Sequence, residues 1–162
     1  MTTVTPSNRA VVTLPSDTQV QITRAFDAPR DLVYRAWTTP ELVRRWWAGD
    51  QGQVTSVEID LRVGGTWRYV MRANAGFEVA FHGQYLEIEP GERIVSTEEF
   101  EGMPGASAVS TTTLTEHDGR TTLTILVRHT SKENRDAHVN SGMETGLQSS
   151  WAMLEQVANS LR

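Results

Sequence analysis

The side chains best suited to acid–base chemistry in this sequence are a histidine and a tyrosine in one strand-like run. His82 lies between Phe81 and Gly83, where an imidazole can act as a general base or orient a ligand carbonyl. Tyr85 follows three residues later, with a hydroxyl that can move a proton. We take His82 and Tyr85 as the catalytic candidates. Strand alternation from Phe81 turns His82 away from the aromatic side, unless a bend near Gly83 turns it inward.

The remaining histidines and acids give weaker indications. His129 ends a predicted strand and either reaches a cavity mouth or makes a local backbone bond, whereas His117 and His138 are expected at the surface. The four histidines lack the short spacings of metal ligands, so no metal site is expected. The chain has no cysteine, which excludes disulfides and thiolate chemistry, and its motifs indicate no cofactor. Asp60 and Arg62 are predicted to form a structural ion pair rather than to bind a ligand.

Wide apolar side chains recur at positions that point toward one interior. In the run from Gly65 to Arg72, Trp67, Tyr69 and Met71 share one strand face. Apolar walls with few polar groups are typical of small-molecule sites. The predicted ligand-binding residues are Trp46, Trp67, Tyr69, Met71, Phe81, Phe100, Met143, Leu147 and Trp151. Of the Trp46-Trp47 pair, one ring is expected to pack a helix on the sheet and the other to close the cavity, and the sequence leaves open which.

Helices and a sheet must position these residues. A short strand over residues 9–14 is expected to form an edge or a dimer contact, and a second strand covers residues 20–26. Asp27 and Pro29 then predict a capped helix over residues 29–37, and Thr39-Pro40-Glu41 begins another.

Short alternating runs over residues 54–129 predict about six antiparallel strands, with Asp118-Gly119 as the strongest hairpin signal. The segment from Phe100 to Ala106 is expected to be either a mobile flap or a simple long hairpin. Thr130 and Glu133 have capping-box spacing. An apolar stripe at helical spacing then predicts one long helix, with Gly142 and Gly146 indicating close approach or open space beneath it. The members of the stripe are Val139, Met143, Leu147, Trp151, Leu154, Ala158 and Leu161.

Composition limits the class of protein. The 162 residues carry 15 basic and 20 acidic side chains, spread along the chain, and the net charge of -5 with no basic face argues against nucleic-acid binding. The sequence shows no secretory signal and no apolar run of membrane-spanning length, so a soluble, cytoplasmic protein without membrane insertion is expected. Residues 1–17 are interpreted as an N-terminal extension and residues 18–162 as a single domain.

Several strings together resemble one known family. They are Ile22 to Arg30, Trp37 to Leu42, Trp46-Trp47, Asp60 to Trp67, Gly83 to Ile94 and Gly142 to Gly146. As a set they resemble the SRPBCC (START-like) superfamily, in the branch homologous to the activator of heat-shock-protein ATPase. The resemblance implies an α+β helix-grip fold: a curved antiparallel sheet of six to seven strands, two short helices after the first main strand and a long C-terminal helix. Many relatives have Gly-Trp in the last helix, whereas this chain has Gly146-Leu147 and a tryptophan at Trp151.

The resemblance also implies a pocket for hydrophobic ligands, but it implies no single reaction, because the superfamily lacks a shared catalytic signature. The first functional hypothesis is binding of a small hydrophobic molecule between the sheet and the last helix, without a defined catalytic activity. The second is an enzyme of the aromatase, cyclase or dehydratase type, and the third is a chaperone-associated protein-binding module. A homodimer and a chaperone are open as partners.

Overall fold

The computed structural model describes residues 7–162, and its frame is one antiparallel sheet. The sheet has eight strands in the order β1-β2-β8-β7-β6-β5-β4-β3. The strands are β1 (Val11–Thr13), β2 (Gln19–Phe26), β3 (Gly52–Ile59), β4 (Thr66–Ala73), β5 (Glu78–Glu89), β6 (Arg93–Phe100), β7 (Ala108–His117) and β8 (Arg120–Arg128). The predicted strands are confirmed, and the short N-terminal one is an edge strand that pairs with β2. The sheet has one strand more than the six to seven predicted, because the short edge strand β1 is part of it.

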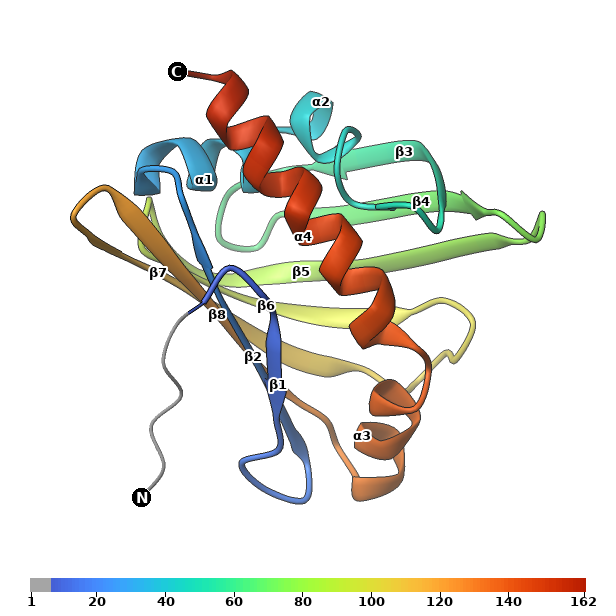
Figure 1. Ribbon diagram of the computed structural model, residues 1–162. Helices are drawn as coiled ribbons and strands as arrows, with labels where there is room; N and C mark the ends of the chain where they lie inside the picture. Colours follow the sequence, from blue (N-terminus) through green and yellow to red (C-terminus); the bar gives the residue numbers. More distant parts are fainter. Residues whose placement is uncertain (1–6) are drawn as a thin grey trace.

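Four helices lie against the sheet. They are α1 (Arg30–Thr38), α2 (Pro40–Val43), α3 (Lys132–Val139) and α4 (Met143–Ser160). Figure 1 shows α4 crossing one face of the sheet, with α1 and α2 beside its C-terminal half and α3 at its N-terminal end. This is the predicted α+β helix-grip arrangement. No helix in residues 7–162 is both long and apolar enough to cross a membrane.

The main core lies between α1, the C-terminal half of α4, and strands β2 and β8. Its largest fully buried side chains include Phe26, Leu123, Trp151 and Leu154. The buried residues of α4 all lie from Ser150 onward. The first turns of α4 contribute less to this core, because Met143 and Leu147 pack against it while only partly buried.

The prediction of one continuous helix after residue 130 is wrong. The chain forms α3 and α4 separately, and Gly142 between them has a φ of 84°, in the left-handed region that favours glycine. Val139 ends α3 and Met143 begins α4. Their spacing of four residues matches a helical repeat, so the apolar stripe in the sequence runs on although the helix is interrupted. The capping box is also displaced, because the Ser131 hydroxyl, not Thr130, accepts the hydrogen bond from the Asn134 amide at 3.0 Å.

Two further local predictions need correction. Asp27 does not cap α1, whose N-cap is Pro29 without a side-chain bond; the Asp27 carboxylate instead accepts from Arg120 at 2.6 Å. The irregularity expected near Gly83 lies instead between Tyr85 and Glu87, where the pairing of β5 with β6 shifts by one residue. The predicted hairpin at Asp118-Gly119 is confirmed, with both residues at positive φ.

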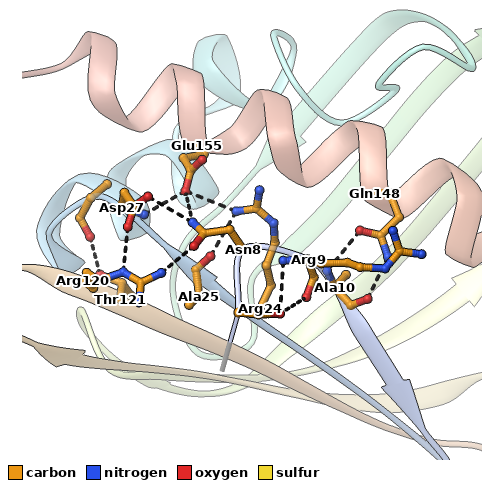
Figure 2. Close-up of polar contacts among 12 residues, drawn as sticks. Asn8, Arg9, Ala10, Arg24, Ala25, Asp27, Arg120, Thr121, Gln148 and Glu155 are labelled. Carbon is orange, nitrogen blue, oxygen red and sulfur yellow. Dashed lines mark hydrogen bonds and ion pairs between the residues drawn. The ribbon is translucent and has the colours of Figure 1, made fainter. Parts of the chain in front are cut away.

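A polar clasp ties α4 to the start of the described chain. We use the name α4 clasp for Asn8, Ala10, Arg24, Gln148 and Glu155 (Figure 2). The Gln148 side chain accepts from the Ala10 amide at 3.0 Å and donates to the Ala10 carbonyl at 2.7 Å. Glu155 accepts from Asn8 at 3.1 Å and pairs with the buried Arg24 guanidinium at 3.4 Å. The clasp therefore fixes the middle and the C-terminal half of α4 over the β1–β2 edge of the sheet.

Candidate ligand cavity

A cavity of about 290 Å³ lies between the inner face of the sheet and the N-terminal half of α4. This volume is close to the lower end of the usual range for small-molecule sites, about 300–1,000 Å³. Its walls are largely aromatic. The aromatic lining residues are Trp37, Trp46, Trp47, Trp67, Tyr69, Phe81, Tyr85 and Trp151.

The structure brings together all but one of the predicted ligand-binding residues. Trp46, Trp67, Tyr69, Met71, Phe81, Met143, Leu147 and Trp151 line the cavity. Phe100 does not line it: the Phe100 ring is 37% exposed and packs on Phe81, with 5.1 Å between ring centroids. Phe100 ends β6 at the rim of the sheet, one strand removed from the aromatic wall of β4.

The tryptophan pair takes two positions. Trp46 is buried, stacks on Trp37 at 5.2 Å and donates its indole N–H to the Ala36 carbonyl at 3.0 Å. Trp47 packs edge-on against Tyr69 and Phe81, with 5.4 and 5.9 Å between the ring centroids. Both indoles line the cavity, but Trp46 is the ring that packs the helical segment and Trp47 is the ring that reaches the aromatic side chains of β4 and β5.

Two tyrosine hydroxyls belong to the cavity walls. Burial raises the pKa of Tyr69 and the pKa of Tyr85, and the nearby Glu98 carboxylate contributes to the shift at Tyr69. Both phenols are therefore neutral hydrogen-bonding groups at ordinary pH. Of the two catalytic candidates, Tyr85 lies in the cavity.

His82 lies on the opposite face of the sheet. Its Nδ1 is 3.0 Å from Glu101, which also accepts from Arg68 at 2.8 and 3.0 Å. These hydrogen bonds, that from Arg68 first, lower the pKa of Glu101 to about 2. His82 therefore belongs to an outer ion-pair cluster and does not reach the cavity, as strand alternation from Phe81 predicts.

The same cluster fixes the start of the segment predicted as a flap or a hairpin. Strands β6 and β7 pair directly, so residues 101–107 form the loop of a hairpin. The Glu101 amide also donates to the Ala80 carbonyl at 2.9 Å. The hairpin alternative is confirmed, and movement of the loop tip stays a prediction.

A polar patch on the cavity floor was missed from the sequence. It consists of Ser96 and Glu98 on β6 with Ser110 and Thr112 on β7, and Ser96 lies directly opposite Ser110. The Ser110 hydroxyl donates to Glu98 at 3.4 Å, and burial raises the pKa of the Glu98 carboxyl. The signal was present: Phe100 was assigned inward, and Glu98, two residues earlier on the same strand, has the same parity.

His138 also lines the cavity, although the sequence placed it at the surface. Its Nδ1 lies 3.0 Å from Nε2 of His129, so the His129 ring contacts another side chain and not the local backbone group expected from the sequence. Burial, with a smaller contribution from His129, lowers the pKa of His138 to about 4. Burial, followed by the charge of Arg135, also lowers the pKa of His129. The His138 imidazole is therefore uncharged at neutral pH.

One charged pair outside the cavity has the structural role expected from the sequence. Arg62 pairs with Asp60 at 2.8 Å in the exposed turn after β3, which confirms the predicted ion pair. Within residues 7–162, no group of three or more histidine or acidic side chains is arranged to hold a metal ion.

Comparison with protein families places the chain. A model described as "Activator of Hsp90 ATPase homolog 1-like protein" matches residues 27–159. The chain belongs to this family. The match begins after β2 and covers strands β3 to β8 and nearly all of α4, and it confirms the resemblance drawn from the sequence. A comparison with curated proteins gives no match.

Solved structures agree with this assignment. A protein from Rhodobacter sphaeroides has 24% identity and a TM-score of 0.87, over 94% of this chain and 99% of that chain. A protein from Chromobacterium violaceum has 28% identity and a TM-score of 0.73, over 88% of this chain and 98% of that chain. CalU16 from Micromonospora echinospora has 25% identity and a TM-score of 0.61, over 88% of this chain and 82% of that chain. The fold of this Hsp90-activator-like chain is therefore shared along nearly its whole length.

Proposed function

We propose that this protein binds a small, largely apolar molecule in the cavity beneath the N-terminal half of α4. The observation that carries the proposal is the cavity itself: about 290 Å³ of space bounded by indole, phenol and phenyl rings, with a few polar groups on its floor. A protein interior is ordinarily packed without voids much larger than a water molecule. An apolar space of this size loses dispersion contacts when empty, and a guest restores them.

The position of the cavity supports the same proposal. The buried residues of α4 begin at Ser150, while Met143, Gly146 and Leu147 face the cavity. A methyl group built on Gly146 would meet only the Gln51 side chain, at 3.4 Å. The helix is therefore held from Gln148 onward by the clasp and by its buried residues, and its first turns are available to cover a bound molecule.

Filling the cavity with a side chain tests the proposal. In Leu147→Trp the larger ring enters the cavity, whereas in the matched variant Gln156→Trp the new ring lies on the exposed side of the same helix. The probe is 2-(2-naphthyl)ethanol, a neutral two-ring alcohol, observed by saturation-transfer NMR. We expect the wild type and Gln156→Trp to bind it and Leu147→Trp to bind about tenfold more weakly or not at all.

Two outcomes contradict the proposal. One is the absence of saturation transfer from the wild type to this probe and to other neutral aromatic probes of similar size. The other is unchanged binding in Leu147→Trp, which would place the probe elsewhere on the protein. The thermal stability of Leu147→Trp supplies an internal check, because a side chain forced into a filled core costs about 1–3 kcal/mol.

A further inference from the structure

The charges around the cavity are unbalanced. Among the described residues that line it, Glu98 is the one acidic side chain, and neither a lysine nor an arginine is present. His138, the remaining titratable nitrogen of the lining, is uncharged at neutral pH, since burial lowers its pKa to about 4. A carboxylate without a cationic partner is unfavourable in apolar surroundings, and it either holds its proton or gains a counter-ion.

The contacts of Glu98 leave room for such a counter-ion. Its recorded hydrogen bond is the long one from the Ser110 hydroxyl, at 3.4 Å. The two nearest acids further along the chain, Glu99 and Glu101, have partners on the outer face of the sheet. His82 contacts both carboxylates, and Arg68 also pairs with Glu101. Glu98 therefore differs from its neighbours both in facing inward and in lacking a basic partner among the described residues.

The walls near Glu98 favour a positive charge as well. Tyr69 and Phe81 line the cavity on the neighbouring strands, and Trp47 packs edge-on against both rings. Aromatic faces attract ammonium groups, by about 0.5–2 kcal/mol depending on desolvation. An anionic ligand meets the opposite situation: no lysine or arginine lines the cavity within the described chain, and the Glu98 carboxylate repels an anion.

We propose that the cavity selects molecules that join a one- or two-ring apolar body to a basic amine, with Glu98 as the counter-ion of the protonated amine. This inference rests on the proposed function and narrows its ligand class. The hydroxyl of Ser110, which is hydrogen-bonded to Glu98, and that of Ser96, directly opposite Ser110, provide further acceptors for the N–H groups of the ammonium. Molecules with the same apolar body and a carboxylate are the class that the cavity rejects.

Three probes on one skeleton test the proposal at pH 7.5. They are 2-(2-naphthyl)ethylamine, 2-(2-naphthyl)ethanol and 2-naphthylacetate, titrated by calorimetry into the full chain. We expect the wild type to bind the amine at least about tenfold more tightly than the alcohol, which corresponds to about 1.4 kcal/mol, and to bind the carboxylate most weakly. Because this ranking uses the unaltered protein, it does not depend on whether any variant folds.

Two matched variants assign the preference to one side chain. Glu98→Gln keeps the shape and removes the charge, and Glu99→Gln makes the same change on the outer face of the same strand. In Glu98→Gln the amine should lose its advantage and bind within about twofold of the alcohol, while Glu99→Gln should keep the wild-type ranking.

The outcomes separate this inference from the proposed function. If the alcohol binds and Leu147→Trp blocks it, but the amine is not preferred or keeps its preference in Glu98→Gln, the amine assignment is overturned and the binding function stands. If none of the three probes binds the wild type, both are overturned.

Discussion

At the scale of single residues, the apolar part of the cavity could be predicted directly, whereas its acidic side chain could be inferred only from strand parity. Trp67, Tyr69 and Met71 alternate with arginines, so their common face is evident. Glu98 lies in the run Thr97-Glu98-Glu99, where both parities are polar and alternation carries no information. The inward direction of Glu98 follows only from its parity with Phe100, two residues later on the same strand. Phe100 is a weak guide, because it lies at the rim of the sheet.

The His129–His138 pair should make stability depend on pH. The pKa of His138 is lowered to about 4 from its ordinary value of 6.5, so between these values the unfolded chain binds a proton that the folded protein does not. The stabilising contribution is thus complete above pH 6.5 and is lost as the pH falls toward 4. In His138→Gln we expect the free energy of unfolding, measured with urea, to fall less over this range, by an amount on the order of 1 kcal/mol.

His117 provides the control for this measurement. Its side chain is 92% exposed at the tip of the β7–β8 hairpin, so His117→Gln should keep the wild-type pH profile. Parallel profiles for the wild type and His138→Gln would show that the buried imidazole does not titrate as argued. Arg135, whose charge acts on His129, is unchanged in both variants.

At the scale of elements, strand positions followed from alternation, but breaks and bulges did not. Val139 and Met143 keep helical spacing across the break at Gly142, so the hydrophobic stripe alone describes one helix where the chain forms two. Periodicity measures spacing along the chain and is insensitive to a change of direction between two turns of helix. The irregularity of this strand was predicted near Gly83, but the register shift lies between Tyr85 and Glu87, which are not glycines.

Gly83 has a different role, which one substitution tests. A methyl group there would overlap the Thr97 carbonyl oxygen on β6 and approach the Trp67 indole nitrogen. Because the first obstacle is backbone, Gly83→Ala should lower the free energy of unfolding by about 1–3 kcal/mol. The same change in Gly146→Ala should raise it by about 0.5–1 kcal/mol, since this glycine is inside α4 with only a side chain in reach.

Chemical denaturation of both variants measures these effects. Opposite signs are the expected result. A neutral Gly83→Ala would mean that β5 and β6 separate easily at this point, and a destabilised Gly146→Ala would mean that the space beneath α4 is smaller than the cavity described above.

At the scale of the whole molecule, the fold was predictable because three kinds of signal agreed: strand alternation, helix spacing and family strings. The cavity was predictable in outline for the same reason, because the aromatic residues had to face the helix. The α4 clasp was not, since Asn8, Arg24 and Glu155 are polar residues far apart in the sequence with no periodic relation. Their pairing depends on where the helix meets the sheet edge, which only the tertiary structure defines.

The clasp should contribute strongly to stability through Arg24. This guanidinium is 4% exposed, lies 4.5 Å from the Phe26 ring centroid and has Glu155 as its carboxylate partner. Removal of one partner from a buried pair leaves an uncompensated charge, at a cost of about 3–5 kcal/mol. Because Glu155 itself is partly exposed, we expect Glu155→Ala to lower the free energy of unfolding by about 2–3 kcal/mol in a denaturant titration.

Gln156→Ala, one residue further along on the exposed side of α4, is the matched control and should change stability by less than about 0.5 kcal/mol. Equal, small effects of the two substitutions would show that solvent replaces Glu155 as the partner of Arg24.

The clasp also bears on the order in which the protein folds. Strands β3 to β8 follow one another in both sequence and sheet, so their pairings close short loops. The hydrogen bonds between Ala10 and Gln148 join residues 138 positions apart, and Asn8 and Glu155 are 147 apart. Contacts of such separation carry the largest loop-closure entropy and form late. The meander can therefore assemble before α4 is fixed above it, and the cavity gains its roof only in the final steps of folding.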